Sequence, residues 1–443
     1  MASDATATIA VPRRSAWLNV AAKIAGAGCS LLVYVMLARI SSTKTFSDVA
    51  VTLAWVALAT TPAALGVPLF LVRYVAEAVA QRRFAYLNGL MRFSFGMTLG
   101  AVSGVALLAA LPVALHWVPL SRDLQCCVLL GAALLPPSVL LQVVAGVLQG
   151  LKRVVAAELL MNVLRPALVC AVLGGAWFAG ERAVSVPAAL GLYIGATVLA
   201  LLACLVHAVR VIPRAALCSP PSYDCRAWLA AATRFMVALV AATLADRVDL
   251  LTLGWTGSAA QIAVYAVATR FSQTLSLANV AIATAMGPYL AESLLELHAG
   301  RAASIQRLVR DTARTTCCVC LAALIGFATI APAVLTLFGT RYSEAYGPLM
   351  ILLVGQSIGA LLGPAGAVAT FAGAPQIVVV GLAVGTAINV SFNMALVPAY
   401  GTTGAAIATA FATVSAALVT WAWTRRRFAV DTCAFVRFDG DAA

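Results

Sequence analysis

VPAALGLYIGATVLALLACLVHAVRVIPRAALCSPPSYDCR, residues 186–226, joins an apolar segment to the longest polar break in the middle of the chain. Residues 186–208 contain no Asp, Glu, Lys or Arg, and a helix of this length rises far enough to cross the hydrocarbon core of a bilayer. Residues 210–226 contain three prolines and three arginines. The stretch therefore predicts a transmembrane helix that leads into a connection between two halves of the molecule.

The same apolar pattern recurs on both sides of this break. Twelve segments of transmembrane length are predicted, six on each side, at 17–38, 48–71, 94–116, 125–148, 156–179, 186–208, 228–255, 260–290, 314–338, 347–371, 376–398 and 403–424. We expect an all-α polytopic membrane protein with about 12 transmembrane helices in two six-helix lobes. The expected parts are an N-terminal lobe over 1–209, a cytoplasmic linker over 210–227, a C-terminal lobe over 228–424 and a cytoplasmic tail over 425–443.

The overall composition excludes a water-soluble globule. The chain is 63% hydrophobic and only 10% charged, with a mean hydropathy of +0.98, and such a surface would not stay dissolved in water. A net charge of +13 would suggest a nucleic-acid partner in a soluble chain. Here the excess falls in loops beside the membrane, where topology and anionic lipid headgroups explain it, so no nucleic-acid partner is expected.

The distribution of basic residues predicts the orientation in the membrane. Nineteen of the 29 Lys and Arg residues lie in alternate gaps between the apolar segments, at 13, 14, 73, 82, 83, 92, 152, 153, 210, 214, 226, 301, 307, 310, 314, 425, 426, 427 and 437. The other gaps hold only five, namely Arg39, Lys44, Arg122, Arg182 and Arg341. By the positive-inside rule, both termini are expected to be cytoplasmic.

Neither a metal site nor a catalytic site is expected. Six of the eleven cysteines lie inside predicted spans and two more, Cys126 and Cys127, lie at the outer end of one, and no cysteine pair together with a neighbouring histidine supplies the geometry of a zinc site. The chain has no Gly-rich phosphate loop, no Ser-His-Asp group in one exposed loop and no extramembrane domain. We therefore expect no enzyme activity, no cofactor and no ATP-driven pump.

A short internal sequence repeat supports two related halves. GVPLFLVRYVAEA at 66–78 and GPYLAESLLE at 287–296 each place Gly and Pro before an apolar stretch and Ala-Glu, and each leads into a basic segment. Parallel six-helix repeats with cytoplasmic ends imply a pseudo-two-fold axis along the membrane normal, which is typical of transporters.

Ionisable side chains inside the predicted spans are expected to mark the functional cavity, because a charge in hydrocarbon costs several kcal/mol unless it faces water or a partner. The set is Lys23, Arg165, Arg234, Asp246, Arg247, Asp249 and Arg270, five basic and two acidic. A cavity with this surplus of positive charge attracts anions, and Arg and Lys suit phosphate. Asn19 and Lys23 are spaced i, i+4 and form one polar stripe, for which cavity lining is favoured over snorkelling.

Two readings stay open for the acidic residues. Asp246 and Arg270 lie at similar depth on helices that are antiparallel neighbours in sequence, so they could form a structural ion pair. Asp246 and Asp249 share a helix face, whereas Arg247 points about 100° away. The alternative is a proton- or cation-sensitive switch whose pairing differs between two states.

The sequence resembles the polysaccharide (O-antigen type) flippases of the multidrug/oligosaccharidyl-lipid/polysaccharide exporter (MOP) superfamily. The most specific motif is NVSFNMALVPAYGTTGAAIAT at 389–409, in which Asn-x-x-x-Asn precedes Pro-x-Tyr-Gly-x-x-Gly-Ala-Ala. The other matching segments are ADRVDLLTLG at 245–254, VYAVATRFSQ at 264–273, LFGTRYSEAYGPLMILLVGQ at 337–356 and GVPLFLVRYVAEA at 66–78. The resemblance is weak between about 95 and 225, and Ser47 stands where the family often has glycine.

This resemblance implies a MATE-like, V-shaped transporter that moves undecaprenyl-diphosphate-linked oligosaccharide from the cytoplasmic to the outer leaflet by alternating access. It places the protein in a bacterial cytoplasmic (inner) membrane, with polysaccharide polymerase and glycosyltransferases as candidate partners. The diphosphate would lie in the cationic cavity, for which the expected substrate-binding residues are Asn19, Lys23, Arg165, Arg247 and Arg270. Asp246 and Asp249 are the candidates for coupling to H⁺ or Na⁺.

Two other functions remain open from the residues. A cation-coupled multidrug or small-molecule antiporter would depend on Asp246 or Asp249 and would confer resistance to cationic dyes. A non-transporting scaffold that recruits glycosyltransferases through its basic loops would still work after inversion of Lys23 and Arg270 to Glu. Twelve spans favour the O-antigen branch over the lipid II branch, whose members usually have more.

Overall fold

A computed structural model describes residues 13–180, 183–273, 302–372 and 374–434 of the 443-residue chain. Those residues are almost wholly helical and contain no strand, so the predicted all-α class is confirmed. The helices are α1 (Arg13–Ile40), α2 (Thr43–Ala63), α3 (Val67–Ala80), α4 (Phe84–Ala114), α5 (Arg122–Gly150), α6 (Val154–Glu158), the π-helix η1 (Leu159–Leu164), α7 (Arg165–Phe178), α8 (Val186–Val211), α9 (Arg214–Cys218), α10 (Cys225–Thr256), α12 (Ala302–Phe338), the 3₁₀-helix η2 (Thr340–Ala345), α13 (Tyr346–Leu361), α14 (Ala365–Phe371) and α15 (Gln376–Phe428).

Nine helical stretches within the described residues are long and apolar enough to cross a membrane. Two features explain much of the difference from the predicted twelve. The predicted span 260–290 is described only as far as 273, where residues 259–273 are helical. The predicted spans 376–398 and 403–424 both lie in α15, which kinks between them at Gly401 (φ 53°, ψ −127°).

Two predicted spans run past the ends of their helices. The expected span 48–71 is broken after Ala63, because Leu65 and Gly66 have φ of 51° and 71° before α3 begins. The expected span 347–371 is broken after Leu361 in the same way, where Gly363 has φ 70°. A hydropathy window averages over such a break, since the residues on either side remain apolar.

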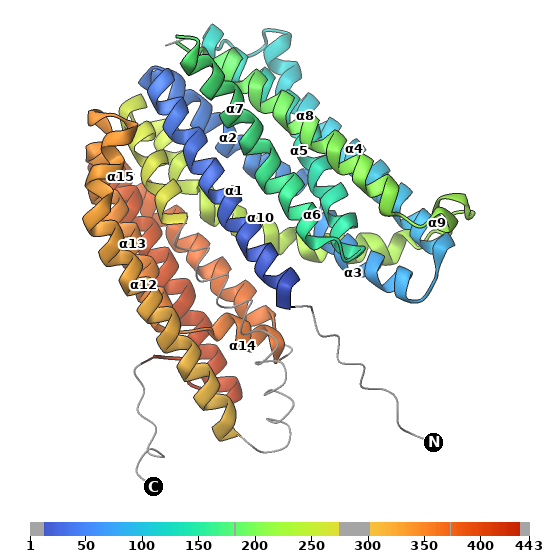
Figure 1. The fold of residues 1–443 in the computed structure, drawn as a ribbon. Coiled ribbons are helices and arrows are strands. Elements are labelled where there is room, and N and C mark those ends of the chain that lie inside the picture. The colour runs from blue at the N-terminus through green and yellow to red at the C-terminus, as the bar shows by residue number, and fades with distance from the viewer. Residues whose placement is uncertain (1–12, 181–182, 274–301, 373, 435–443) are drawn as a thin grey trace.

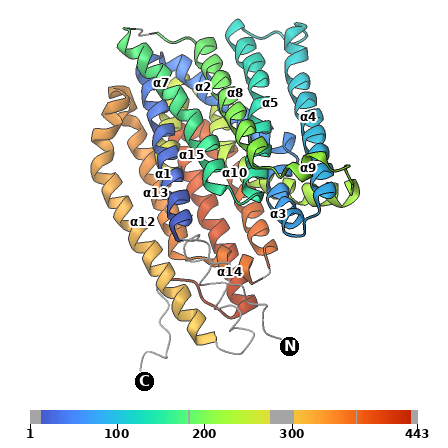
Figure 2. The same cartoon turned by 45° about the vertical axis from the view of Figure 1, so that its right-hand side comes forward.

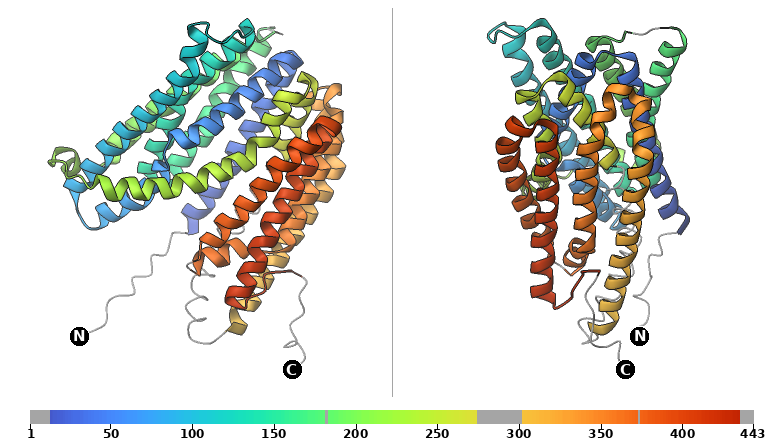
Figure 3. Two further views of the ribbon diagram at one scale, coloured as in Figure 1. Left: turned by 180° about the vertical axis from the view of Figure 1, so that it is seen from behind. Right: turned by 90° about the vertical axis from the view of Figure 1, so that its left-hand side faces the viewer.

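The helices form two lobes. In the N-lobe, α5 packs against α3, α4 and α8, and α1 packs against α7. In the C-lobe, α15 packs against α10, α13 and α14, and α12 packs against α13. Figures 1 and 2 show the lobes side by side, and Figure 3 shows from behind that they approach at one end and separate towards the ends that carry α9 and α14.

Helix α10 belongs to both lobes. Its first turn contains Trp228, which is fully buried and donates from Nε1 to the Tyr86 hydroxyl of α4 at 2.5 Å. The preceding segment crosses the same end of α4, where the Asn88 side chain donates to Ser219 O at 2.6 Å. The other half of α10 packs against α15 and α2, so this helix carries its central residues between the lobes.

The lobes are tied together at the end where they approach. Arg39 of α1 donates to the carbonyls of Thr336, at 2.9 Å, and Leu337 at the end of α12. Arg341 of η2 donates to the Thr43 hydroxyl at the start of α2. The rings of Phe46 and Tyr342 lie 5.9 Å apart between these contacts. Each lobe thus contributes one arginine that reaches a helix end of the other.

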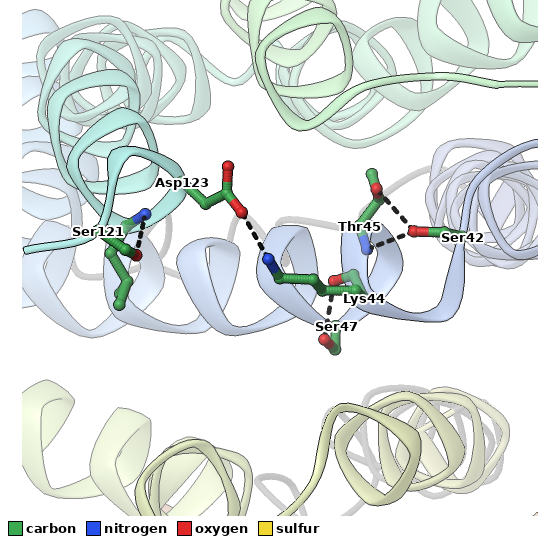
Figure 4. A network of polar contacts seen from close by, with 7 residues as sticks. Ser42, Lys44, Thr45, Ser47, Ser121 and Asp123 are labelled. Carbon is green, nitrogen blue, oxygen red and sulfur yellow. Dashed lines mark hydrogen bonds and ion pairs between the residues drawn. The ribbon is translucent and has the colours of Figure 1, made fainter.

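A separate polar group at the same end of the molecule ties together two helices of the N-lobe (Figure 4). Lys44 of α2 forms an exposed ion pair with Asp123 of α5 at 2.5 Å. Ser42 and Ser121 cap the two helices by accepting hydrogen bonds from the backbone of Thr45 and Leu124. The ion pair joins α2 to α5, each cap lies within its own helix, and none of these contacts involves the C-lobe.

Candidate functional site

A cavity of about 440 Å³, here called the central cavity, lies where both lobes contribute residues. Its charged and amide lining comes from α1, the α6–η1–α7 helix, α10 and the helical residues 259–273. These side chains are Lys23, Glu158, Asn162, Arg165, Asp246, Arg247, Arg270 and Gln273. Four cations and two carboxylates therefore share a single cavity.

Four of the five residues predicted for substrate binding line the central cavity, namely Lys23, Arg165, Arg247 and Arg270. Asn19, the fifth, lies on α1 one turn before Lys23 and is not part of the lining. Within the described residues its Oδ1 atom is buried without a hydrogen-bond partner. Arg234 lies on α10, and its side chain is outside the described residues.

The π-helix η1 determines how Arg165 enters the cavity. Pro166 has no N–H, so the carbonyl of Asn162 lacks its usual i→i+4 donor, and the helix widens there instead. The widened turn packs closely on α1, since a Cβ added at Gly26 would lie 2.5 Å from Asn162 O. This close approach places Lys23 of α1 opposite Glu158, Asn162 and Arg165.

Three of the cations have no carboxylate partner. Among the described residues, none lies within ion-pair distance of Lys23, Arg165 or Arg247. Arg270 differs, because its guanidinium lies 4.7 Å from the centre of the Tyr34 ring and donates to Gln273 Oε1 at 3.1 Å. Asp246 and Arg270 line the same cavity, and their predicted ion pair stays a prediction.

Glu158 is a site residue that the sequence analysis missed. Glu158 as a whole residue is only 7% exposed, and its carboxylate accepts a hydrogen bond from Asn162 Nδ2 at 2.8 Å. The rule applied to the other charged residues would have found it, since it lies inside the predicted span 156–179. It places a negative charge among the cations at the wall formed by α6.

A second cavity, of about 480 Å³, lies within the C-lobe and contains Asp249 in its lining. The Asp249 carboxylate is almost fully buried and accepts hydrogen bonds from the Tyr265 hydroxyl at 2.6 Å and the Thr409 hydroxyl at 3.3 Å. Asn389 and Asn393 of the Asn-x-x-x-Asn motif bond to each other beside them at 2.6 Å. The motif thus contributes Asn389 and Thr409 to the wall around one buried carboxylate.

Asp246 connects the cavities. It lines both the central cavity and the C-lobe cavity, whereas Arg247 lines only the former of these two. This agrees with the expectation that Arg247 points away from the face shared by Asp246 and Asp249. A charge change at Asp246 would therefore be felt on both sides.

A third cavity, of about 540 Å³, extends from the central cavity into the N-lobe between α2, α5 and α8. It shares Arg165, Asp246, Arg247 and Arg270 with the central cavity. In the described part of the chain, no group of three or more His, Cys, Asp or Glu residues could hold a metal ion. The arrangement as a whole suits an anion with an uncharged extension.

A sequence model of the family described as "Polysaccharide biosynthesis protein" matches residues 13–294. Comparison with curated protein sequences gives no significant match.

Several solved structures share the fold over nearly the whole chain. A multidrug resistance MATE family transporter of the MOP superfamily, in an inward-facing conformation, has a TM-score of 0.72 at 15% identity over 94% of this chain and 98% of its own. A mutant of the Vibrio cholerae MATE transporter VcmN has a TM-score of 0.64 at 15% identity, over 94% and 95%. The lipid II flippase MurJ, in an inward closed conformation, has a TM-score of 0.63 at 10% identity, over 92% and 87%.

Proposed function

Since this chain belongs to the polysaccharide biosynthesis protein family and is a multi-pass membrane protein with a transporter fold, we propose that it is a flippase for lipid-linked saccharides. Its substrate is an undecaprenyl-diphosphate-linked oligosaccharide or polysaccharide repeat unit. The protein moves this unit from the cytoplasmic to the outer leaflet by alternating access.

The observation that carries the proposal is the group of unpaired cations in the central cavity. Lys23, Arg165 and Arg247 have no carboxylate within ion-pair distance in the described chain. Holding such charges away from bulk water costs free energy that an anion would recover. A diphosphate carries the charge and the multiple acceptor oxygens that suit one lysine and several arginines.

Such a substrate has three parts, a diphosphate, a glycan and a lipid tail, and each is proposed to occupy a different space. The diphosphate binds in the central cavity, the glycan crosses in the hydrated space around it, and the lipid tail stays in the bilayer between the lobes. The contacts of Arg39 and Arg341 close one end in the conformation described here. Transport requires a second conformation in which these contacts open and the other end closes.

Asp246 and Asp249 are the proposed coupling residues. Asp249 is surrounded by oxygen atoms from Tyr265, Thr409 and Asn389, and a buried carboxylate in such a setting is stabilised by H⁺ or Na⁺. Neutralising Asp249 would also lower the negative charge beside Asp246, at the edge of the central cavity. Ion binding would thereby favour entry of an anionic substrate.

The cellular setting follows from the same proposal. The protein acts in a bacterial cytoplasmic (inner) membrane with both termini in the cytoplasm, as the basic loops predict. O-antigen and lipopolysaccharide assembly is the proposed pathway, and polysaccharide polymerase and glycosyltransferases are its proposed partners.

Deletion of the gene provides the test. In a strain without a redundant flippase, deletion should abolish surface polysaccharide and cause lipid-linked repeat units to accumulate in the cytoplasmic leaflet. The wild-type gene should restore display, and a Lys23→Glu/Arg270→Glu variant that inserts normally should not. Normal display in the deletion strain would refute the assignment.

A cation-coupled multidrug antiporter is the second candidate, favoured by the buried Asp249 beside a polar cavity and by the fold shared with multidrug transporters. Expression in a dye-sensitive host separates the two functions. Resistance to cationic dyes that is lost with Asp249→Asn would support the antiporter. Unchanged sensitivity, together with restored polysaccharide display, would support the flippase.

A further inference from the structure

The N-lobe cavity differs in chemistry from the central cavity that it adjoins. All the charged residues in its lining, Arg165, Asp246, Arg247 and Arg270, are those shared with the central cavity. Beyond this boundary its wall contains only neutral side chains. A ligand held by the cations would therefore extend into a space without charge.

One face of α5 provides much of the polar lining in this space. Ser138, Gln142 and Gln149 are spaced i, i+4 and i+11, about three helical turns in all, and all three line the cavity. The residues between them, such as Val143 and Leu148, are buried in the protein core. Two carboxamides and a hydroxyl thus point away from the core and into the cavity.

These side chains have no partner within the described protein. No hydrogen bond joins Ser138 Oγ or either glutamine carboxamide to another described residue. A polar group inside an apolar helix is costly unless water or a ligand satisfies it. Three such groups in a row on one face leave donors and acceptors available to water or to a ligand with hydroxyl groups.

Helix α8 supplies the facing wall. Tyr193 and Thr197 line the cavity one turn apart, and the Thr197 hydroxyl already donates to the Tyr193 carbonyl oxygen at 2.7 Å. The Tyr193 hydroxyl, in contrast, has no hydrogen-bond partner among the described residues. An aromatic ring beside amides matches a pyranose, which has an apolar C–H face and a rim of hydroxyl groups.

We propose that Ser138, Gln142, Gln149 and Tyr193 form a subsite for uncharged sugar residues, namely those nearest to the diphosphate. This inference rests on the proposed function. Carboxamides suit the task because each both donates and accepts, as a sugar hydroxyl does. An acidic sugar is disfavoured at this subsite, because its carboxylate would be held in a cavity whose wall offers it no counter-ion beyond the shared boundary.

Binding to purified full-length protein tests the subsite with three probes. These are undecaprenyl diphosphate alone, the same lipid carrying N-acetylglucosamine or galactose, and the same lipid carrying glucuronic acid. Wild-type protein should bind the neutral-sugar lipids more tightly than the bare lipid and more tightly than the glucuronic acid lipid. The Gln142→Leu/Gln149→Leu variant should keep its affinity for the bare lipid and lose about tenfold in affinity for the neutral-sugar lipids, since each lost hydrogen bond costs a few-fold.

Gln125→Leu is the matched control, because Gln125 lies at the far end of α5, bonds to Leu120 O and lines none of these cavities. It should leave the affinity for every probe unchanged. If the double variant does not fold, Gln149→Asn replaces it, with about a threefold loss expected for the neutral-sugar lipids.

Three results would overturn the subsite. They are a double variant with undiminished preference for neutral sugars, a double variant that loses equal affinity for bare lipid, and a wild-type protein that gains nothing from the sugar. In each case the proposed function survives, because wild-type protein still binds undecaprenyl diphosphate. Failure of wild-type protein to bind any of the probes would instead refute the flippase assignment together with the subsite.

Discussion

At the scale of single residues, Arg270 is the cation whose present contacts can be exchanged for a ligand. Its guanidinium rests over the Tyr34 ring of the N-lobe and donates to Gln273 on its own helix. The Tyr34 ring and the Gln273 carboxamide are neutral groups, which bind an arginine less strongly than a phosphate does. In the proposed flippase, an incoming diphosphate would draw on this guanidinium, which already lies at the central cavity between the lobes.

Substitution of Arg270 separates a ligand clamp from a structural role. Arg270→Ala should leave expression and insertion near normal and weaken binding of undecaprenyl diphosphate by roughly ten- to a hundredfold, since hydrogen bonds to charged groups contribute about 1.5–3 kcal/mol. Arg270→Lys should restore part of the loss, because the charge remains but the planar fork does not. Surface display and lipid binding are the measurements.

The double change Asp246→Ala/Arg270→Ala provides the opposing outcome. If Arg270 served only as the structural partner of Asp246, removing both should recover much of the stability and transport lost in the single variant. A double variant as active as the parent would exclude the clamp.

Asp249 allows a test of coupling by an isosteric change. Asp249→Asn retains an oxygen that can accept from both Tyr265 and Thr409, which donate to the same carboxylate oxygen, and gives up only the bond from Leu250 N, so most of the packing should survive while the charge is lost. Flipping measured in proteoliposomes should become insensitive to imposed H⁺ or Na⁺ gradients. The control is Asp123→Asn, at the exposed ion pair with Lys44, which should keep the gradient dependence of the wild-type protein. If Asp249→Asn also keeps that dependence, Asp249 plays no part in coupling.

At the scale of elements, the contact between α1 and the π-helix η1 determines how Lys23 and Arg165 are placed in the central cavity. The two backbones approach closely at Gly26, which lines the central cavity three residues after Lys23. Pro166 explains why the partner helix is widened at this point. The geometry of Lys23 relative to Arg165 thus depends on one small residue and one proline.

Gly26→Ala should disturb this contact, whereas Gly28→Ala should not. The added Cβ at 26 meets a backbone oxygen at 2.5 Å, while the Cβ at 28 meets nothing within 4 Å. Overpacking of this kind costs about 1–3 kcal/mol, so thermal unfolding of the purified Gly26→Ala protein should occur several degrees lower. Equal unfolding temperatures for the two variants would contradict the close approach.

At the scale of the whole molecule, the lobes are held together at one end by reciprocal arginine contacts. Arg39 reaches the C-terminal end of α12, where its charge also complements the helix dipole, and Arg341 reaches Thr43. The Lys44–Asp123 pair near Thr43 joins two helices of the same lobe. When the lobes separate there, the two arginine contacts must break, together with the packing of Phe46 on Tyr342, whereas the Lys44–Asp123 pair can stay.

Removal of these contacts should shift the protein towards opening at that end. In Arg39→Ala/Arg341→Ala, a cysteine placed at Ser138 should react at least about fivefold faster with an impermeant thiol reagent added outside, since about 1 kcal/mol is lost. The background of native cysteines is subtracted with the parent double variant. Lys44→Ala is the control and should leave the rate unchanged, and an equal rate in all variants would show that the arginines do not hold this end closed.

The sequence by itself determined the class of protein, most helix positions and, apart from Glu158, the charged side chains that line the central cavity. These properties are local, because the apolar length of a segment, and whether a charged residue falls inside it, can be read from consecutive residues alone. Lys23, Arg165, Arg247 and Arg270 were found in this way. The family motif at 389–409 was equally visible.

Only the tertiary structure decided which cavity each side chain faces. Asn19 lies outside the central cavity, Glu158 lies inside it, and Gln142 and Gln149 face a neutral space in the N-lobe. Which face of a helix meets a neighbouring helix depends on contacts between residues more than a hundred positions apart, as between Gly26 and Asn162. A lipid-facing and a cavity-facing glutamine look alike in sequence, because hydropathy records how polar a residue is but not which neighbours surround it.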